Sequence, residues 1–207
     1  MQLADQQGIG ALSMRKLAAA LGVEAMSLYH HVKSRENLLD QMVDRVFAAL
    51  SEQSDNKSGE WQPWIMEAAT HMRSVLRKHP WSVGLLDSRR NPGSATLGYQ
   101  NARLGRLREA GFSLSMAAHA VAVLDSFVYG FVLQEIALPF ENGTDLETLV
   151  QDIESSMPAG EYPYLVEMMQ HLVLQQDYSF AREFAFGLNV LITGLGVPSD
   201  KDQSNCL

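Results

Sequence analysis

The 207-residue sequence lacks several features of secreted, membrane and disulfide-stabilised proteins. It contains one cysteine, Cys206, so no disulfide can form within the chain, which fits a reducing compartment. No apolar run reaches the roughly 18 residues that cross a bilayer. The start, MQLADQQG, has neither the basic nor the apolar region of a signal peptide. These absences predict a cytoplasmic protein with no membrane partner.

Patterns typical of catalysis and metal binding are also missing. The sequence has no glycine-rich phosphate loop, no nucleophile elbow and no HExxH or CxxC pattern. Histidines outside residues 30–31 share no metal-ligand spacing, so neither a metal nor another cofactor is predicted. An all-α enzyme using Asp125 or Glu135 is one alternative, but acids on such an apolar helix are more often polar residues at a dimer seam or in a pocket. We therefore predict no enzyme and no catalytic residue.

Residues 13–35, SMRKLAAALGVEAMSLYHHVKSR, are the most informative stretch. Apolar residues recur at helical spacing up to Leu21, and Gly22 then allows the left-handed backbone of a tight turn. Leu28 and Val32 resume the helical spacing. Two short helices with apolar faces on either side of a glycine turn are typical of a helix-turn-helix.

The outward positions of the second helix carry small, hydroxyl, aromatic and imidazole groups and no acid. Hydroxyls and imidazoles can bond to phosphates and base edges, and apolar groups can contact a thymine methyl. An ordinary helical hairpin with solvated charges has the same spacing, so spacing alone leaves both interpretations open. Residues 1–50 hold five basic and five acidic residues, so residues 51–207 carry the whole net charge of −8. Acidity there would repel DNA and favour contact at the N-terminal end.

SMRKLAAALGV followed by SLYHHVKSRENLLDQMVDRV resembles the DNA-binding domain of the TetR family of bacterial transcriptional repressors. The shared pattern is Ser/Thr-x-Arg-x-Leu-Ala-x-x-Leu-Gly-Val, then Leu-Tyr-x-His-Val, then a basic residue and Leu-Leu. HMRSVLRKHP, LREAGFSL and EFAFGLNVLITGL resemble the tetracycline-repressor type of C-terminal domain. The resemblance implies a homodimer that binds a palindromic operator in double-stranded DNA and is released by a small-molecule effector.

The DNA contacts are assigned by position in this motif. Arg15 is the best candidate for a guanine edge or a phosphate. The second helix should face the groove, and Arg35 should reach a phosphate. The residues predicted to contact DNA are Ser13, Arg15, Ala25, Met26, Ser27, Tyr29, His30, His31 and Arg35.

Helical periodicity without strand-like alternation predicts an all-α fold. We predict a helix-turn-helix DNA-binding domain over residues 1–50, whose first helix is shortened relative to the family, and a polar loop over 51–60. A helical effector-binding and dimerisation domain is predicted over 61–197, followed by a disordered tail over 198–207. Its helices are predicted at 61–78, 81–88, 94–110, 114–138, 164–175 and 178–196, with 139–163 largely loop.

By resemblance, the effector binds among the helices of the C-terminal domain. The candidate residues are mostly large and apolar, with two arginines able to orient an acidic or carbonyl group, although the apolar ones would equally suit a plain core. Leu85 stands near the place of the magnesium-binding histidine of tetracycline-responsive members, so neither tetracycline nor magnesium is expected. The predicted effector residues are Trp64, Met72, Leu85, Arg89, Tyr99, Arg103 and Phe131.

Two predicted helices, 114–138 and 178–196, carry apolar stripes. The resemblance implies that they pair with their copies as a four-helix bundle, which would set two DNA-binding units about one helical turn of DNA apart, roughly 34–36 Å. A monomer core is the alternative explanation for the same stripes. The residues predicted at the dimer interface are Val121, Leu124, Val128, Phe184, Leu188, Leu191 and Ile192.

Two functional alternatives also remain at this point. A helical dimer that binds a small molecule could have lost DNA binding with its shortened first helix. Activation of transcription in place of repression is a lesser alternative. The sequence specifies neither the operator, nor the regulated genes, nor the effector.

Overall fold

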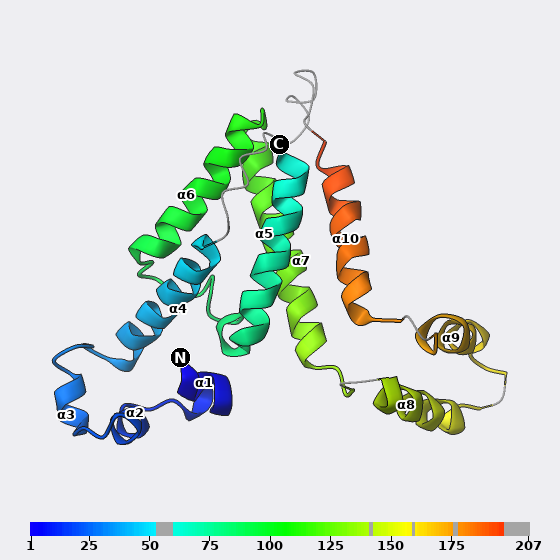
Figure 1. Ribbon diagram of the computed structural model, residues 1–207, viewed down its shortest axis with the longest axis horizontal. Coiled ribbons are helices and arrows are strands. Elements are labelled where there is room, and N and C mark those ends of the chain that lie inside the picture. Colours follow the sequence, from blue (N-terminus) through cyan, green and yellow to red (C-terminus); the bar gives the residue numbers. More distant parts are fainter. Residues whose placement is uncertain (53–59, 141–142, 159, 176–177, 197–207) are drawn as a thin grey trace.

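The computed structural model describes residues 1–52, 60–140, 143–158, 160–175 and 178–196, and these form helices without a strand. The fold is therefore all-α, as predicted (Figure 1). Two short 3₁₀ turns, η1 (Ile9–Ala11) and η2 (Pro80–Ser82), and a π-helical turn (Met169–Val173) accompany the α-helices. The α-helices are α1 (Gln2–Gln7), α2 (Met14–Leu21), α3 (Ala25–Leu28), α4 (Arg35–Ser51), α5 (Trp61–Lys78), α6 (Ser94–Glu109), α7 (Leu114–Ile136), α8 (Gly143–Ser156), α9 (Pro163–Met168) and α10 (Phe180–Gly194).

Serine caps and one glycine turn fix several helix ends. The hydroxyls of Ser13, Ser34 and Ser113 accept hydrogen bonds from backbone N–H groups in the first turns of α2, α4 and α7, at 3.1–3.2 Å. Such bonds satisfy N–H groups that have no partner within a helix. Gly22 ends α2 with a φ of 69°, in the left-handed region where glycine has no steric cost. The turn predicted from the sequence is confirmed.

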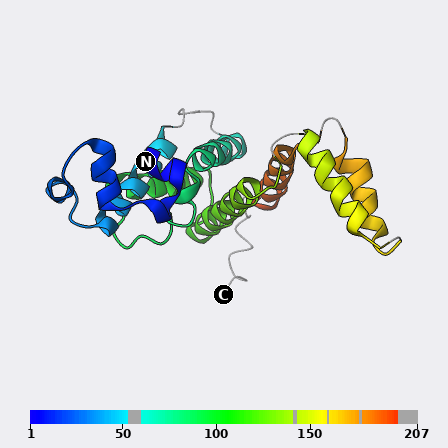
Figure 2. The same ribbon diagram turned by 90° about the horizontal axis from the view of Figure 1, so that it is seen from below.

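The main core surrounds α7, which packs against α5, α6 and α10 (Figures 1 and 2). Phe47, Leu76, Val128 and Leu188 are almost fully buried in it and come from four different helices. The helix α4 packs along α6, so it belongs to this core although it directly follows the helix-turn-helix. By length and composition α7 is long and apolar enough to cross a membrane, but core helices of soluble proteins have the same properties. In this structure 39% of its most apolar 18-residue stretch is buried.

A second, smaller core lies inside the helix-turn-helix. Met14 and Ala18 of α2 pack against Leu28 of α3 and against Val32. The apolar faces predicted on both sides of Gly22 therefore meet, except that Leu21 is 60% exposed. Because these residues cluster separately from the main core, α2 and α3 form a small unit attached to α4.

The prediction that residues 139–163 are largely loop is wrong, because α8 spans Gly143–Ser156. Leu146 and Val150, one helical turn apart, pack against Met169 in a third core. The helices α8 and α9 with the π-helical turn, here called the arm, stand away from the main core (Figures 1 and 2). The predicted helix 164–175 is accordingly the short α9 followed by the π-helical turn.

Other predicted boundaries shift by smaller amounts. The expected helix over 81–88 is η2 followed by turns. The sequence predicts a helix over 94–110, and α6 spans Ser94–Glu109, with Leu97 58% exposed. The predicted tail 198–207 and residues 53–59 of the predicted loop lie outside the described residues.

Candidate functional site

The helix α3 presents a small outward surface. Its buried residue, Leu28, anchors it to α2, whereas Met26 is 72% and Tyr29 46% exposed. His30 and His31 follow on the same exposed segment. These four side chains are accessible to a DNA groove, as their predicted roles require.

Two other predicted DNA contacts on α3 are less accessible. Ala25 is half-buried against the small core of the helix-turn-helix. Ser27 is half-buried, and its hydroxyl donates to the backbone oxygen of Glu24 at 2.7 Å, so it has only its acceptor lone pairs left to offer.

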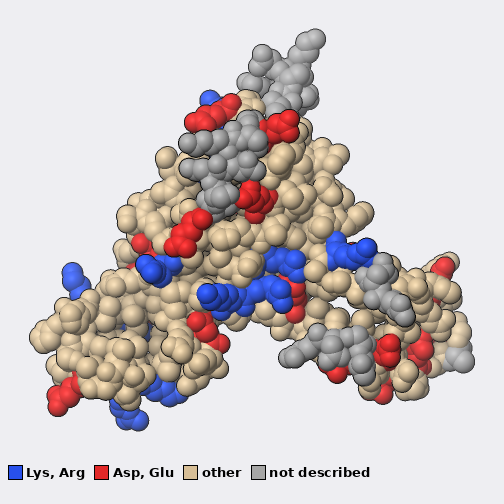
Figure 3. Space-filling model, in the orientation of Figure 1, with Lys and Arg blue, Asp and Glu red and all other residues tan. Residues whose placement is uncertain are grey.

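Basic groups surround this surface. Ser13 and Arg15 are exposed at the start of α2, and Figure 3 shows Lys and Arg side chains at the lower edge of the α2–α3 region. Arg35 also holds the fold together: its Nε donates to the backbone oxygen of Leu12 at 3.2 Å, and its Nη2 to that of Ile9 at 3.1 Å. Arg35 therefore fixes the segment before α2 against the start of α4, besides the phosphate contact predicted for it.

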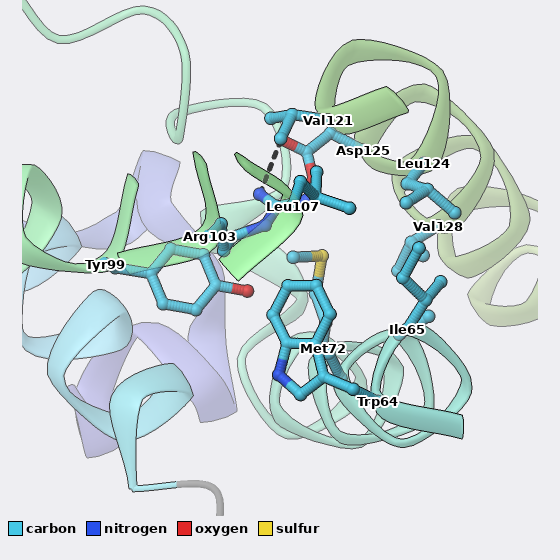
Figure 4. A pocket seen from close by; sticks show the side chains of 12 residues that line it. Trp64, Ile65, Met72, Tyr99, Arg103, Leu107, Val121, Leu124, Asp125 and Val128 are labelled. Atoms are coloured by element: carbon cyan, nitrogen blue, oxygen red, sulfur yellow. Dashed lines mark hydrogen bonds and ion pairs between the residues drawn. The ribbon is translucent and has the colours of Figure 1, made fainter. Parts of the chain in front are cut away.

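A cavity lies between α5, α6 and α7 (Figure 4). The space between its lining atoms, including the part open to solvent, is about 340 Å³. The centre of a water molecule fits into about 20 Å³ of it. That smaller volume is close to what one water needs. A larger ligand must therefore move side chains apart. The lining residues are Trp64, Ile65, Ala68, Ala69, Met72, Tyr99, Arg103, Leu107, Val121, Leu124, Asp125 and Val128.

The polar end of this cavity is a buried ion pair. The guanidinium of Arg103 donates from Nη1 and Nη2 to the two carboxylate oxygens of Asp125, at 2.9 and 2.6 Å. The same guanidinium lies 5.2 Å from the ring centre of Tyr99. Burial raises the pKa of Tyr99 to about 12, so this phenol stays protonated at neutral pH. The pair links α6 to α7.

Four of the seven predicted effector residues line this cavity: Trp64, Met72, Tyr99 and Arg103. The other three lie elsewhere. Leu85 packs at the edge of the main core. Phe131 packs against Phe180 and Phe184 of α10, at centroid distances of 4.7 and 5.1 Å.

Arg89 binds the acids of α4 and does not line the cavity. Its Nη2 donates to Glu36 and its Nε to Asp40, both at 2.7 Å. One turn further along α4, the carboxylate of Asp44 accepts from the backbone N–H of Thr96 at 2.8 Å and from its hydroxyl at 2.9 Å. An acid of α4 thus caps the N-terminus of α6, where negative charge also suits the helix dipole.

A second connection joins α1 to the body of the protein. One carboxylate oxygen of Asp5 accepts hydrogen bonds from Trp81 Nε1 at 2.6 Å and from His79 Nδ1 at 2.7 Å. Both aromatic side chains are largely buried at the end of α5. Sequence periodicity gave no indication of this contact, since its partners are 74–76 residues apart.

The residues predicted at the dimer interface mostly lie inside the protomer. Leu124, Val128, Phe184 and Leu188 are at most 5% exposed, because α5 and α10 cover that side of α7. In the single chain these four side chains therefore belong to the core of the protomer, and their place at a dimer interface stays a prediction. Val121 and Leu191 are half-buried, and Ile192 is 9% exposed. The exposed large apolar residues of the same two helices are Leu114, Val123, Leu133, Ile136, Phe186 and Val190.

The chain matches two family models. Residues 1–42 match the tetR family of bacterial regulatory proteins, and residues 53–197 match the tetracycline repressor-like C-terminal domain. Among curated relatives, the transcriptional repressor DrrR1 of Streptomyces coeruleorubidus is 29% identical over 95% of this chain and 74% of its own length. The class D tetracycline repressor protein of Escherichia coli is 31% identical over 95% of this chain and 85% of its own.

Solved structures agree with these matches. Apo ActR from Streptomyces coelicolor has a TM-score of 0.74 at 27% identity, covering 94% of this chain and 89% of its own. ActR in complex with actinorhodin has a TM-score of 0.73 at 28% identity, covering 94% and 91%. These findings do not favour the alternative in which DNA binding is lost. The chain belongs to the TetR family of DNA-binding transcriptional regulators.

Proposed function

We propose that this protein is a homodimeric repressor that binds a palindromic operator and that an effector releases by entering the α5–α6–α7 cavity. One observation carries the proposal: α6 lines the cavity with Tyr99 and Arg103, and its N-terminus is capped by Asp44 of α4. Because α4 directly follows the helix-turn-helix, a displacement of α6 is passed to the DNA-binding surface.

The energetic requirement on the effector is limited. It must bind more tightly to the form whose helix-turn-helix units do not fit the operator. The closed cavity, with room for about one water, is consistent with a ligand that must separate α5, α6 and α7 in order to enter. Cytoplasmic location, absence of enzymatic activity and absence of a required metal are parts of the same proposal.

The exposed apolar residues of α7 and α10 form the proposed dimer surface. Phe186 is 69% and Val190 56% exposed, a large apolar area for a protein in water. Light scattering on the purified chain should give the mass of a dimer. Phe186→Glu should give a monomer, and Tyr164→Glu, at an even more exposed aromatic residue on the arm, should not.

The operator is tested by selection of random duplex DNA against the purified protein. We expect a palindrome bound by a dimer. Arg15→Ala with Tyr29→Ala should weaken binding about 100-fold or more, since each such contact is worth roughly 1–3 kcal/mol. Arg90→Ala, a change of an exposed arginine outside α2 and α3, is the control. A protein that selects no DNA, or a double variant with unchanged affinity, would refute this docking surface.

A further inference from the structure

The cavity between α5, α6 and α7 also restricts the chemistry of what it can hold, and this inference rests on the proposed function. Most of its wall is apolar: Trp64 and Met72 of α5 and Val128 of α7 line it, while Tyr99 and Arg103 of α6 stand together on one side (Figure 4). The space of about 340 Å³ includes open solvent, and only about 20 Å³ admits the centre of a water molecule, so a ring-sized ligand must displace side chains. Met72 is unbranched and adaptable, so it can move for a flat ring system.

The charges that line the cavity already balance. Among the described lining residues, Arg103 and Asp125 are the charged ones, and they neutralise each other in a two-bond pair. A carboxylate ligand would bring a second buried negative charge with no cation to match it, which is costly in a low-dielectric site. A cationic ligand would meet the like charge of Arg103.

Hydrogen-bond donors remain available at the polar end. A guanidinium carries five N–H groups, and Asp125 accepts from only two of those of Arg103. The remaining N–H groups of Arg103 have no hydrogen-bond acceptor among the described residues. The hydroxyl of Tyr99 points toward the cavity and likewise has no protein acceptor there (Figure 4). Tyr129, one turn beyond Asp125 on α7, has a buried hydroxyl without a partner among the described residues, but it does not line this cavity.

We infer that the effector is an uncharged aromatic molecule whose carbonyl or phenol oxygen accepts a hydrogen bond from Arg103, and that the cavity rejects the corresponding carboxylates. The apolar walls hold the rings, and the surplus of donors selects for an acceptor oxygen. The ion pair stays intact, because the ligand uses N–H groups that Asp125 leaves unoccupied.

Three tricyclic probes with one skeleton test this inference on the full chain: 9-fluorenone, fluorene and 9-fluorenone-2-carboxylate. Binding is measured at pH 7 by quenching of tryptophan fluorescence and by calorimetry. The ketone should bind about 10-fold or more tighter than fluorene, since a hydrogen bond to a charged donor contributes that much. It should bind about 100-fold tighter than the carboxylate, which carries the uncompensated charge.

A matched double variant identifies the group that selects the ketone. Arg103→Met with Asp125→Leu removes the pair at constant net charge, a replacement that buried ion pairs often tolerate. It should still bind fluorene and should lose the preference for the ketone over fluorene. Tyr99→Phe should reduce that preference only in part. Thermal unfolding of each variant shows that it is folded.

Three outcomes overturn the inference: a carboxylate that binds as tightly as the ketone, a ketone that binds no better than fluorene, or no binding by any probe. Retention of the ketone preference in the double variant overturns it too. The proposed function is tested separately by the DNA selection. If an operator is recovered while the probes fail, the inferred effector class is wrong and the proposed function is retained. If no operator is recovered, the proposed function is wrong, whatever the probes bind.

Discussion

Gly93→Ala tests whether Asp44 of α4 holds the N-terminus of α6. Gly93 has φ −81° and ψ 179°, extended values that alanine adopts without strain. A Cβ atom at this position, however, would overlap the carboxylate of Asp44. Alanine can therefore be accommodated only if that carboxylate moves away from Thr96.

The cost follows from the bonds that Asp44 would lose. It accepts from the N–H and the hydroxyl of Thr96 at 2.8 and 2.9 Å. Losing a helix cap costs about 1 kcal/mol, and a bond to a charged acceptor about 1.5–3 kcal/mol. Alanine returns about 0.4–1 kcal/mol by restricting the unfolded chain. We expect a net loss of about 1–2 kcal/mol, or a drop in Tm of about 2–8 °C for a chain of this length.

The assay is thermal unfolding of the wild type, Gly93→Ala, Asp44→Ala and the double variant. In the Asp44→Ala background the same glycine replacement should be neutral or slightly stabilising, because no carboxylate remains to displace. The coupling energy between the two sites should therefore be about 1–2 kcal/mol. Gly98→Ala, where nothing lies within 4 Å of the new Cβ, is the control and should be stabilising. An equal drop in Tm in both backgrounds would refute the capping role of Asp44.

Three further predictions concern packing and pH. Gly187→Ala places a Cβ 2.7 Å from the ring of Phe127 and should lower Tm by pushing α10 from α7, whereas Gly130→Ala, with open space around it, should not. Because burial raises the pKa of Tyr99 to about 12, the unfolded state loses that proton first, so stability should fall between pH 10 and 12; Tyr99→Phe should flatten this part of a urea-unfolding profile. Burial and a neighbouring carboxylate raise the pKa of Asp87, so stability falls as pH rises through that pKa; Asp87→Asn should raise the urea midpoint at pH 7 and leave it unchanged at pH 3.

Local patterns predict most of the helices. Ser13, Gly22 and Ser34 act within a few residues of themselves, so their roles follow from the sequence around them. The same holds for the exposed face of α3. Pro139, Gly143 and Pro158 favour loops in this region, whereas Leu146 and Val150 lie at helical spacing and form the buried face of α8.

Contacts between distant segments could not be predicted from periodicity. An apolar stripe shows that a face of α7 must be covered, but not whether α10 of the same chain or a partner covers it. Leu124 and Leu188 were assigned to a partner for this reason. Arg89 was assigned to the cavity by its charge, yet its partners Glu36 and Asp40 lie 49–53 residues earlier in the chain.

The separate small core of the helix-turn-helix has an evolutionary consequence. Met14, Ala18, Leu28 and Val32 hold α2 and α3 together without contributing to the core around the cavity. Substitutions at Met26, Tyr29 or His31, the proposed DNA contacts, are therefore expected to change the DNA sequence that is recognised and to leave the cavity intact. Substitutions at the cavity likewise leave α3 unchanged. A lineage with this architecture can acquire a new operator and a new effector in independent steps, provided that α4 still connects the helix-turn-helix to α6.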